Sequence, residues 1–503
     1  MRPKARRSRA RPVQRRASQG GIVLIYALFV VVLILILGLA FMQTSALETL
    51  ENTHAVQRLQ ATAAAEYGVA RARAMCDSTG NQHGDWYFMA YNGNSLSSSW
   101  ATSASYSGHS ICNLFTNQAV PNIVGATYSV VIEDLTGNVV TSGLYRIHGY
   151  GTVGGFTRQV ALDSQGLNFA SFGWLTNSET NGGNPVWFIT GDTLSGLIWT
   201  NGQFNIDGNP TFNGPAYSGS GSLNYMNGGP PNDNPNFAKG INFNAPNLNI
   251  GSVLNGNDIT AIDSAAQAAG GILLSSNSGN GYSLTFNTGG TFTICQLDSS
   301  GDQLSPALYN NVAVSTTDGA FYFQDKVLVS GTLTGQVTVA TSSGNDIDVV
   351  NNLVYSYPAN PASMFVAGFN QSDPLLTSKC ALISGGNVVI KPSAWSGTLT
   401  KPKTGSSYYA YSTSWADAGA NMYITATCAS VTGSFENYSS YVTSLPQKKL
   451  NIYGGVVQIT RGVVGQTSGT GFIKNYLYDT RFQTSPPPFL PTIGAAFSNW
   501  QLY

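Results

Sequence analysis

The sequence predicts a mainly β protein that begins with one long α-helix. Three observations support this prediction. Residues 22 to 42 form an apolar run without a charged residue, an Asn or a Pro. Residues 43 to 75 contain no Pro and one Gly, and they are rich in Ala, Leu, Glu, Gln and Arg, which favour a helix. Only 10% of all residues are charged, while Gly, Asn, Ser and aromatic residues, which build turns and strands, are abundant after the helix.

The apolar run is long enough to cross a membrane. A helix that rises 1.5 Å per residue needs about 20 apolar residues to span a hydrocarbon core of about 30 Å. Eight of the 24 Lys and Arg residues lie within the first sixteen positions, and the next charge of either sign is Glu48. By the positive-inside rule, the N-terminus stays in the cytoplasm and the chain after the run is exported. We therefore expect a basic leader at 1–21 and a membrane and assembly helix at 22–76.

The exported part of the chain is acidic. After the eight basic residues of the leader, 16 basic and 24 acidic residues remain, a net charge of −8. Nucleic-acid binding needs clustered Lys and Arg to displace counterions from phosphates. We therefore predict no nucleic-acid partner. The 42% of hydrophobic residues argue for a packed core rather than disorder.

The helix should continue far beyond the membrane. Residues 22 to 75 would form a rod about 80 Å long. An apolar stripe of mostly small residues is predicted along its exported half at Leu47, Leu50, Leu59, Ala63, Tyr67, Ala70 and Ala74. Such a stripe needs a partner. The partner is either the body of the same chain or neighbouring, related helices, and opposite faces of the helix could serve the two.

A change of composition after Cys76 marks a domain boundary. Apolar or alternating segments at 127–132, 144–148 and 156–162, with Gly154-Gly155 between the last two, predict an antiparallel β-meander within 77–166. From 167 to 492 short apolar triplets recur between Gly, Asn and Asp residues. Examples are Phe321-Tyr322-Phe323, Val327-Leu328-Val329 and Ile347-Asp348-Val349.

These triplets predict a β-solenoid (β-helix-like) head, because each short strand of a solenoid pairs with a neighbour one coil away. A β-sandwich head is the alternative. One helix should interrupt the strands, capped by Asn257-Asp258, carrying an apolar face from Ile259 to Ala269 and stopped by Gly270-Gly271. We expect residues 493–503 to be a C-terminal tail.

Four N-terminal segments carry a resemblance to a known family. They are 16–21 (RASQGG), 22–25 (IVLI), 47–51 (LETLE) and 60–68 (QATAAAEYG). Together they resemble the N-terminal segment of PilX-type minor pilins and type II secretion pseudopilins. The resemblance implies processing by prepilin peptidase between Gly21 and Ile22, after Gly20-Gly21. The alternative is a plain signal anchor or a secretory peptide, for which only a poor cleavage site exists near Ala46.

One position departs from the major pilins of that family. They carry Glu five residues after the cut, where this chain has Tyr26. The resemblance therefore implies a minor or tip subunit of a type IV pilus or related filament, with other pilin or pseudopilin subunits as partners. It also implies a single-pass protein of the bacterial inner membrane that reaches a filament or the cell surface after assembly.

The head carries a second resemblance. Its segments are 195–202 (SGLIWTNG), 208–214 (GNPTFNG), 476–481 (YLYDTR) and 486–488 (PPP). They resemble the C-terminal domain of large pilin-anchored bacterial surface proteins, a family with no characterised chemistry. This resemblance implies an architecture for 167–492 and no activity; adhesion through a surface glycan or protein ligand is the function we expect.

We predict that the chain is not an enzyme and holds no cofactor. Asp346 and Asp348 lie two apart, which on a strand places both carboxylates on one face, where they could act as acid and base. The neighbouring Asn residues favour a solvated corner instead. The four His residues have no zinc-site spacing, and calcium is conceivable only at Asn-rich turns such as 232–234. A membrane-tethered glycan-binding or glycan-cleaving β-helix stays the alternative function.

The five cysteines are Cys76, Cys112, Cys295, Cys380 and Cys428. Export permits disulfides, and we expect the pairs Cys76–Cys112 and Cys380–Cys428, which leave Cys295 alone. Buried free thiols are the alternative. The odd number and the wide spacings exclude a zinc site of the Cys-x-x-Cys type.

Overall fold

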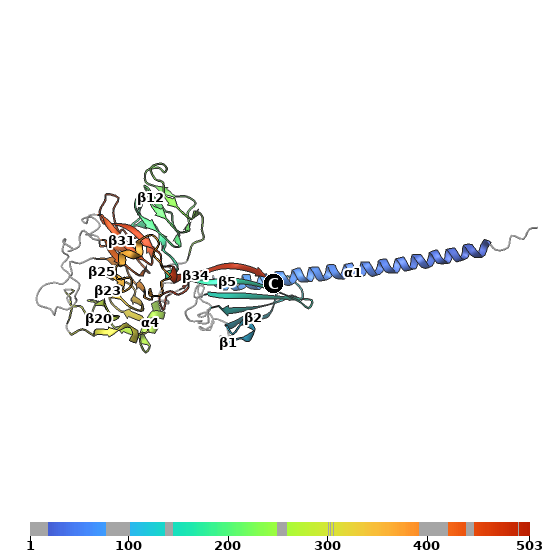
Figure 1. Cartoon of the computed structure of the whole chain (residues 1–503), viewed down its shortest axis with the longest axis horizontal. Helices are drawn as coiled ribbons and strands as arrows, with labels where there is room; N and C mark the ends of the chain where they lie inside the picture. The colour runs from blue at the N-terminus through green and yellow to red at the C-terminus, as the bar shows by residue number, and fades with distance from the viewer. Residues whose placement is uncertain are drawn as a thin grey trace, which may run out of the picture.

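The chain consists of one long N-terminal helix followed by a strand-rich body with several sheets (Figure 1). This confirms the predicted mainly β protein with a long helix. The computed structural model describes residues 19–76, 101–135, 144–248, 259–299, 301, 303–304, 306–391, 421–438, 447–490 and 492–503. The predicted leader up to residue 18 and the segment 77–100 lie outside the described residues.

Helix α1 runs without interruption from Gln19 to Cys76 over 58 residues. Its apolar run extends away from the body (Figure 1). The large apolar side chains from Ile22 to Met42 are 44–74% exposed, and this helix is long and apolar enough to cross a membrane. The continuous rod predicted from helix propensity is therefore present.

The second half of α1 packs on a six-stranded antiparallel sheet, which we call the base sheet. Its strands, in spatial order, are β1 (Ala101–Thr102), β2 (Ser110–Ala119), β3 (Thr127–Asp134), β4 (Leu144–Val153), β5 (Phe156–Asn168) and β34 (Thr492–Leu502). The predicted meander is present, and Gly154 and Gly155 form the β4–β5 hairpin turn with φ values of +57° and +84°. Glycine tolerates these positive angles, which a two-residue hairpin requires.

The C-terminal end of the chain is a strand, where we expected a tail at 493–503. Strand β34 pairs antiparallel with β5, so that Phe497 lies opposite Ser164. The pairing depends on the free edge of β5, which no local pattern in 493–503 reveals. Consequently the whole head is inserted between two neighbouring strands of the base sheet.

Two large sheets build the head. The first has ten strands, in the order β17 (Ile241–Asn242), β14 (Ala216–Ser218), β11 (Ile198–Thr200), β6 (Trp174–Ser178), β32 (Gly455–Thr460), β29 (Thr427–Ser430), β26 (Lys379–Ser384), β24 (Gln336–Thr341), β22 (Ala320–Phe323) and β18 (Ile272–Leu274). All its neighbouring strands are parallel.

The second sheet has thirteen strands. Eleven of them lie side by side in the order β16 (Asn236–Phe237), β13 (Thr211–Phe212), β10 (Thr193–Leu194), β33 (Phe472–Leu477), β31 (Lys448–Tyr453), β28 (Met422–Ile424), β25 (Ile347–Tyr355), β23 (Val327–Leu333), β19 (Tyr282–Asn287), β20 (Thr291–Gln296) and β21 (Tyr309–Ala313). The other two form a branch, in which β27 (Val388–Ile390) pairs with β25 and β30 (Phe435–Asn437) pairs with β27. Its pairs are parallel except β19–β20 and β20–β21. Two small sheets contain β9 (Phe188–Ile189), β12 (Asn205–Asp207) and β15 (Asn224–Tyr225), and β7 (Thr180–Asn181) and β8 (Asn184–Pro185).

From β22 to β26 the chain alternates between the two large sheets, and each strand pairs in parallel with the next strand of its own sheet. The β-sandwich considered above has antiparallel sheets, so this pairing differs from it. The largest apolar core gathers side chains from both sheets. The predicted interrupting helix is α4 (Ile259–Gln267); its Ile262 and Ala266 pack against the ten-stranded sheet beside Tyr322. Its expected cap at 257–258 lies outside the described residues.

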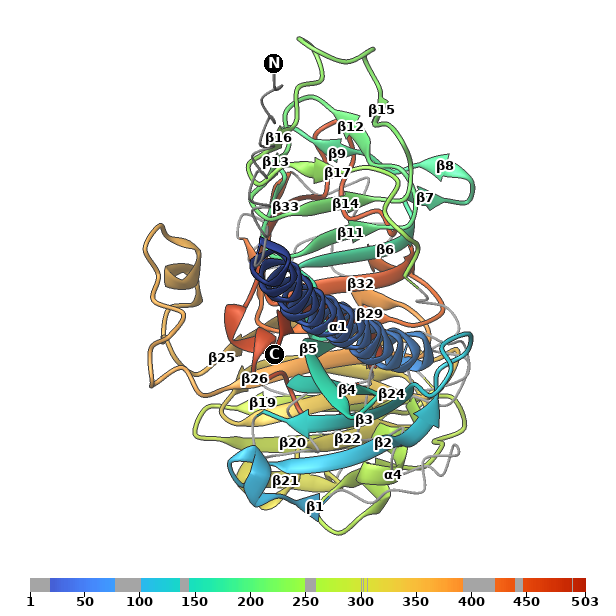
Figure 2. The same cartoon turned by 90° about the vertical axis from the view of Figure 1, so that its right-hand side faces the viewer.

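In the ten-stranded sheet, the strand that comes first along the chain, β6, lies beside the strand that comes last along the chain, β32. Figure 2 shows the order β11, β6, β32, and Trp174 of β6 pairs with both Ile198 and Val456. Buried ion pairs join these distant segments, namely Glu179–Arg461 at 2.6 Å and Asp192–Lys474 at 2.7 Å. We call this contact the head seam. Burial of a charged group is costly when it has no partner of opposite charge. The two ion pairs supply that partner for each of the four charged side chains in the head seam.

Candidate functional sites on the helix and the head

The C-terminal half of α1 has one covered face. Its buried residues are Ala61, Ala64, Ala65, Gly68, Val69 and Ala72. Two glycines of β4 let the backbones approach: a Cβ at Gly151 would lie 2.0 Å from the carbonyl oxygen of Ala61, and one at Gly149 would lie 2.6 Å from that of Ala65. No other residue type fits at such a distance. The covered face is therefore bound to the base sheet by close backbone contact.

The apolar stripe predicted for this half of the helix does not lie on the covered face. All seven of its residues, from Leu47 to Ala74, are exposed, with Leu59 at 71% and Tyr67 at 37%. Alanines occur on every side of this helix, so their spacing alone cannot identify the face that a sheet covers. The glycines of β4, more than 70 residues away, select the covered face.

Five of these seven residues belong to an uncharged stripe on the side of α1 that points away from the base sheet. We call it the exposed stripe; its members are Phe41, Ser45, Thr49, Asn52, Val56, Leu59, Ala63, Tyr67, Ala70 and Ala74, all exposed. They recur at steps of three and four residues, which at 3.6 residues per turn keeps them on one side, opposite the covered face. None carries a charge, although Glu48, Glu51, Arg58 and Glu66 lie on neighbouring faces. The exposed stripe begins at Phe41, near the end of the apolar run, and continues along one side of the rest of α1.

The residues predicted at the leader boundary lie in the first turns of α1. Gly20 and Gly21 are helical, and Ile22 and Tyr26 are 59% and 68% exposed. Cleavage between Gly21 and Ile22 stays a prediction. Tyr26 brings no charge into the apolar run.

The cysteines divide into two groups. Cys112, Cys295, Cys380 and Cys428 are buried. The side chain of Cys76 lies outside the description, so the Cys76–Cys112 pair stays a prediction. Cys380 and Cys428 are free thiols rather than the expected disulfide. The register pairs Cys428 with Leu382, two residues beyond Cys380, which separates the two Cα atoms by about 8 Å, too far for a disulfide.

An acidic pocket of about 640 Å³ opens on the thirteen-stranded sheet. Asp346 and Asp348 both line it. Asp348 is 5% exposed, in contrast to the solvated corner that its Asn neighbours suggested. Burial raises the pKa of the Asp348 carboxyl, and the ammonium of Lys391, 3.0 Å from it, opposes that rise.

A third carboxylate, which sequence reasoning missed, lines the same pocket. Glu436 lies on β30, and the register aligns Asp348, Val389 and Glu436 on three neighbouring strands. Burial and the nearby Asp346 raise the pKa of the Glu436 carboxyl. The signal was present as triplets whose outer residues are buried, and all of these outer residues except Asn437 are apolar. Only the parallel register shows that these triplets are neighbours.

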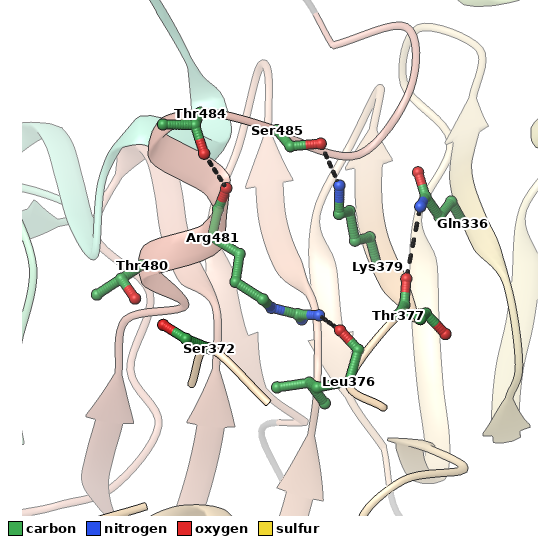
Figure 3. A pocket seen from close by; sticks show the side chains of 9 residues that line it. All are labelled: Gln336, Ser372, Leu376, Thr377, Lys379, Thr480, Arg481, Thr484 and Ser485. Atoms are coloured by element: carbon green, nitrogen blue, oxygen red, sulfur yellow. Dashed lines mark hydrogen bonds between the residues drawn. The ribbon is translucent and has the colours of Figure 1, made fainter. Parts of the chain in front are cut away.

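A basic pocket of about 440 Å³ lies near the junction with the base sheet, between β24, β26 and the 3-10 helix Thr480–Gln483 (Figure 3). Lys379 and Arg481 line it together with five hydroxyl-bearing residues, and none of its nine residues is acidic. The sequence contains no motif for this pocket, because residues 336, 379 and 485 are far apart in the chain.

The residues that the structure describes contain no group of three or more His, Cys, Asp or Glu side chains that could hold a metal ion. The turn at 232–234, considered for calcium, has another role. The carboxylate of Asp233 accepts backbone N–H groups of Gly208 at 2.8 Å and Asn227 at 2.6 Å. These hydrogen bonds lower the pKa of Asp233 against the opposing effect of desolvation, and they use the oxygens that calcium would need.

No protein-family model and no curated protein matches the chain. Among solved structures, it is similar to the crystal structure of the competence-associated pilin ComZ from Thermus thermophilus. The sequences are 10% identical, the alignment covers 89% of this chain and 98% of that one, and the TM-score is 0.31. Among the described residues, one helix is long and apolar enough to span a membrane, and a large strand-rich body follows it.

Proposed function

We propose that this chain is a pilin-like subunit of the PilX-type minor pilin or pseudopilin kind. Its helix α1 packs among other pilin or pseudopilin helices in a type IV pilus or related filament, or in the complex that initiates one. The head then lies outside the cell, where it serves adhesion or assembly. The exposed stripe of α1 is the observation that carries this proposal.

The stripe suits contact with a second helix. Val56 and Leu59 are 52% and 71% exposed, although burial of such side chains is favourable. The alanines at 63, 70 and 74 would let a second helix approach closely, as small residues do between membrane helices. Because the stripe has no charge, a partner helix could cover it without burying an unpaired ion.

The apolar run and Tyr26 fit the same role. A subunit that leaves the bilayer must exchange lipid contacts for protein contacts along residues 22–42. Without a glutamate at position 26, this chain offers no carboxylate to the amino terminus of a neighbour, which favours a minor or tip position. We propose that the basic leader keeps the N-terminus in the cytoplasm and that prepilin peptidase removes it after Gly21.

We further infer that the head is a β-solenoid. Its strands alternate between two sheets and pair in parallel with the next strand of the same sheet, as coils of a solenoid do. The base sheet holds this head through both β5 and β34. Two neighbouring strands give a stiffer connection than one linker, so the head would keep a fixed direction relative to α1.

Expression of the full chain with and without prepilin peptidase tests the proposal. We expect a mature N-terminus at Ile22 when the peptidase is present and an intact leader when it is absent. Edman or mass-spectrometric sequencing of the purified chain reads the result. A leader that stays intact with the peptidase, or a cut near Ala46, contradicts the proposal.

The acidic pocket favours a second candidate function, a membrane-tethered protein that binds surface glycans. Its carboxylates could accept hydrogen bonds from sugar hydroxyls beside the ring of Tyr438. We propose binding rather than cleavage, because Lys391 already pairs with Asp348. Incubation of the detergent-solubilised chain with a polysaccharide panel separates binding from turnover. Asp346→Asn combined with Asp348→Asn, and Glu436→Gln separately, should weaken binding; turnover by the native chain would contradict a non-enzymatic head.

A further inference from the structure

The basic pocket contains a buried ammonium without a carboxylate partner. Lys379 is the first residue of β26 and is only 7% exposed. Among the described residues, its Nζ donates one hydrogen bond, to Oγ of Ser485, and it forms no ion pair. An ammonium has three donors, so two remain for a ligand. Burial lowers the pKa of Lys379 and the charge of Arg481 lowers it further, while the charge of Asp479 opposes both effects.

The second cation of the pocket already has its counter-ion. Arg481 Nε donates to Asp479 Oδ1 at 2.8 Å, and its Nη2 donates to the carbonyl oxygen of Ser378 at 3.0 Å. Its Nη1 donates to the carbonyl of Leu376, toward which it points in Figure 3. Asp479 is fully buried. The charges of Arg481 and Asp479 therefore neutralise each other, and the positive charge of Lys379 has no ion-pair partner among the described residues.

We propose that this pocket binds a tetrahedral oxyanion, a phosphate or sulfate group, through Lys379. The guanidinium fork of Arg481, which would suit a planar carboxylate, is occupied by Asp479. What remains is a point charge and the rotatable hydroxyl of Ser485, and these can follow the oxygens of a tetrahedral group. Buried charges in proteins are normally paired, and the oxyanion supplies the missing pair.

The size of the pocket indicates where the oxyanion comes from. Its volume of about 440 Å³ lies in the range of small-molecule sites and exceeds what one inorganic anion needs. The phosphate or sulfate group could be a free anion, or it could be an ester on a larger molecule such as a phosphorylated sugar. We expect the ester to bind more tightly, because its sugar can contact the amide of Gln336 and the hydroxyl groups that line the pocket.

Thermal unfolding and calorimetry of the detergent-solubilised full chain test this proposal, with inorganic phosphate, sulfate, glucose 6-phosphate and acetate at constant ionic strength. We expect phosphate, sulfate and the sugar phosphate to bind and to raise the unfolding temperature of the head, and acetate to do so at least about tenfold more weakly. A sugar phosphate that binds at least about tenfold more tightly than phosphate identifies the ester as the source; equal affinities identify the free anion.

Three variants decide whether binding occurs in this pocket. Lys379→Gln should reduce the affinity for phosphate at least about tenfold, whereas Lys449→Gln, at an exposed position of β31, should not change it. If Lys379→Gln does not fold, Ser485→Ala, at an exposed position, should still weaken binding several-fold. The proposal is overturned if no oxyanion binds, or if the folded Lys379→Gln chain, or in its place Ser485→Ala, binds like the native chain. None of these results depends on filament assembly.

Discussion

The two faces of α1 beyond the apolar run contain the same kinds of side chain and differ in what covers them. Ala61, Ala64 and Ala65 are fully buried against the base sheet. Ala63 and Ala70, on the opposite side of the same turns, are exposed. The difference arises in β4, where Gly149 and Gly151 leave room for the helix backbone. Small residues on a helix permit close contact, and the partner surface decides which of them are used.

The head seam joins distant segments through buried ion pairs, whereas the covered face of α1 is held by close backbone contact. A substitution in the head seam should give the largest loss of stability. Arg461 is fully buried, pairs with Glu179 and lies 3.6 Å from the centre of the Phe188 ring. Arg461→Met leaves the buried Glu179 carboxylate without its ion-pair partner, although Trp174 and Thr176 still donate hydrogen bonds to it. The loss should cost about 3–5 kcal/mol. Denaturant unfolding of the full chain in detergent measures this cost in the head transition.

The control for the head seam removes both charges. The double variant Glu179→Leu with Arg461→Met should recover most of the stability, because a buried ion pair contributes little net free energy relative to apolar side chains. A single Arg461→Met variant that loses less than about 1 kcal/mol contradicts the importance of the pair.

Gly151→Val addresses the covered face directly. Its Cβ would lie 2.0 Å from the Ala61 carbonyl oxygen, so helix and sheet must separate. We expect a loss of about 3 kcal/mol in the base, at the upper end of the usual cost of overpacking. Limited proteolysis near residue 76 should show the released helix. A fully protected helix in this variant would contradict the close contact.

A matched pair of alanine variants compares the two faces within one helical turn. Ala65→Leu inserts volume under the helix and should destabilise the base by about 1–3 kcal/mol. Ala63→Leu points away from the sheet and should stay within about 0.5 kcal/mol of the native chain. Thermal unfolding of the unassembled protein in detergent measures both; equal losses would mean that the two faces do not differ.

The smallest expected effect is a pH dependence of stability, and it comes from His148 on the face of the base sheet that points away from α1. Burial lowers the pKa of His148 from its usual 6.5, while a hydrogen bond to Glu133 at 2.6 Å opposes this. Because the unfolded state takes up the proton first, stability is full above pH 6.5 and declines as the pH falls from 6.5 toward the lowered pKa. His148→Gln should remove this slope, whereas the covered face of α1 has no titratable group to produce one. An unchanged slope in the variant contradicts the assignment.

Three elements of the fold could be predicted from the sequence, because the residues of each element determine it locally. The helix follows from residue propensity over 22–75, the β4–β5 hairpin from Gly154-Gly155, and α4 from an apolar face stopped by two glycines. The rest depends on pairing between distant segments. Strand β34 needs the edge of β5, Glu436 joins Asp348 only through parallel register, and Lys379 meets Ser485 across more than 100 residues. No local pattern shows that these distant segments are neighbours.

The most direct measurement of the central claim compares filament incorporation of two neighbouring arginine variants. Val56 lies on the exposed stripe, and Ala55, equally outside the sheet, lies beside it. Both variants should reach the membrane and unfold like the native chain, because neither residue is buried. We predict that Val56→Arg reduces the amount in sheared filaments at least about tenfold, since a charge there must be buried against a neighbouring helix, and that Ala55→Arg has little effect. Native incorporation of Val56→Arg, or equal loss in both variants, would contradict the stripe as the assembly surface.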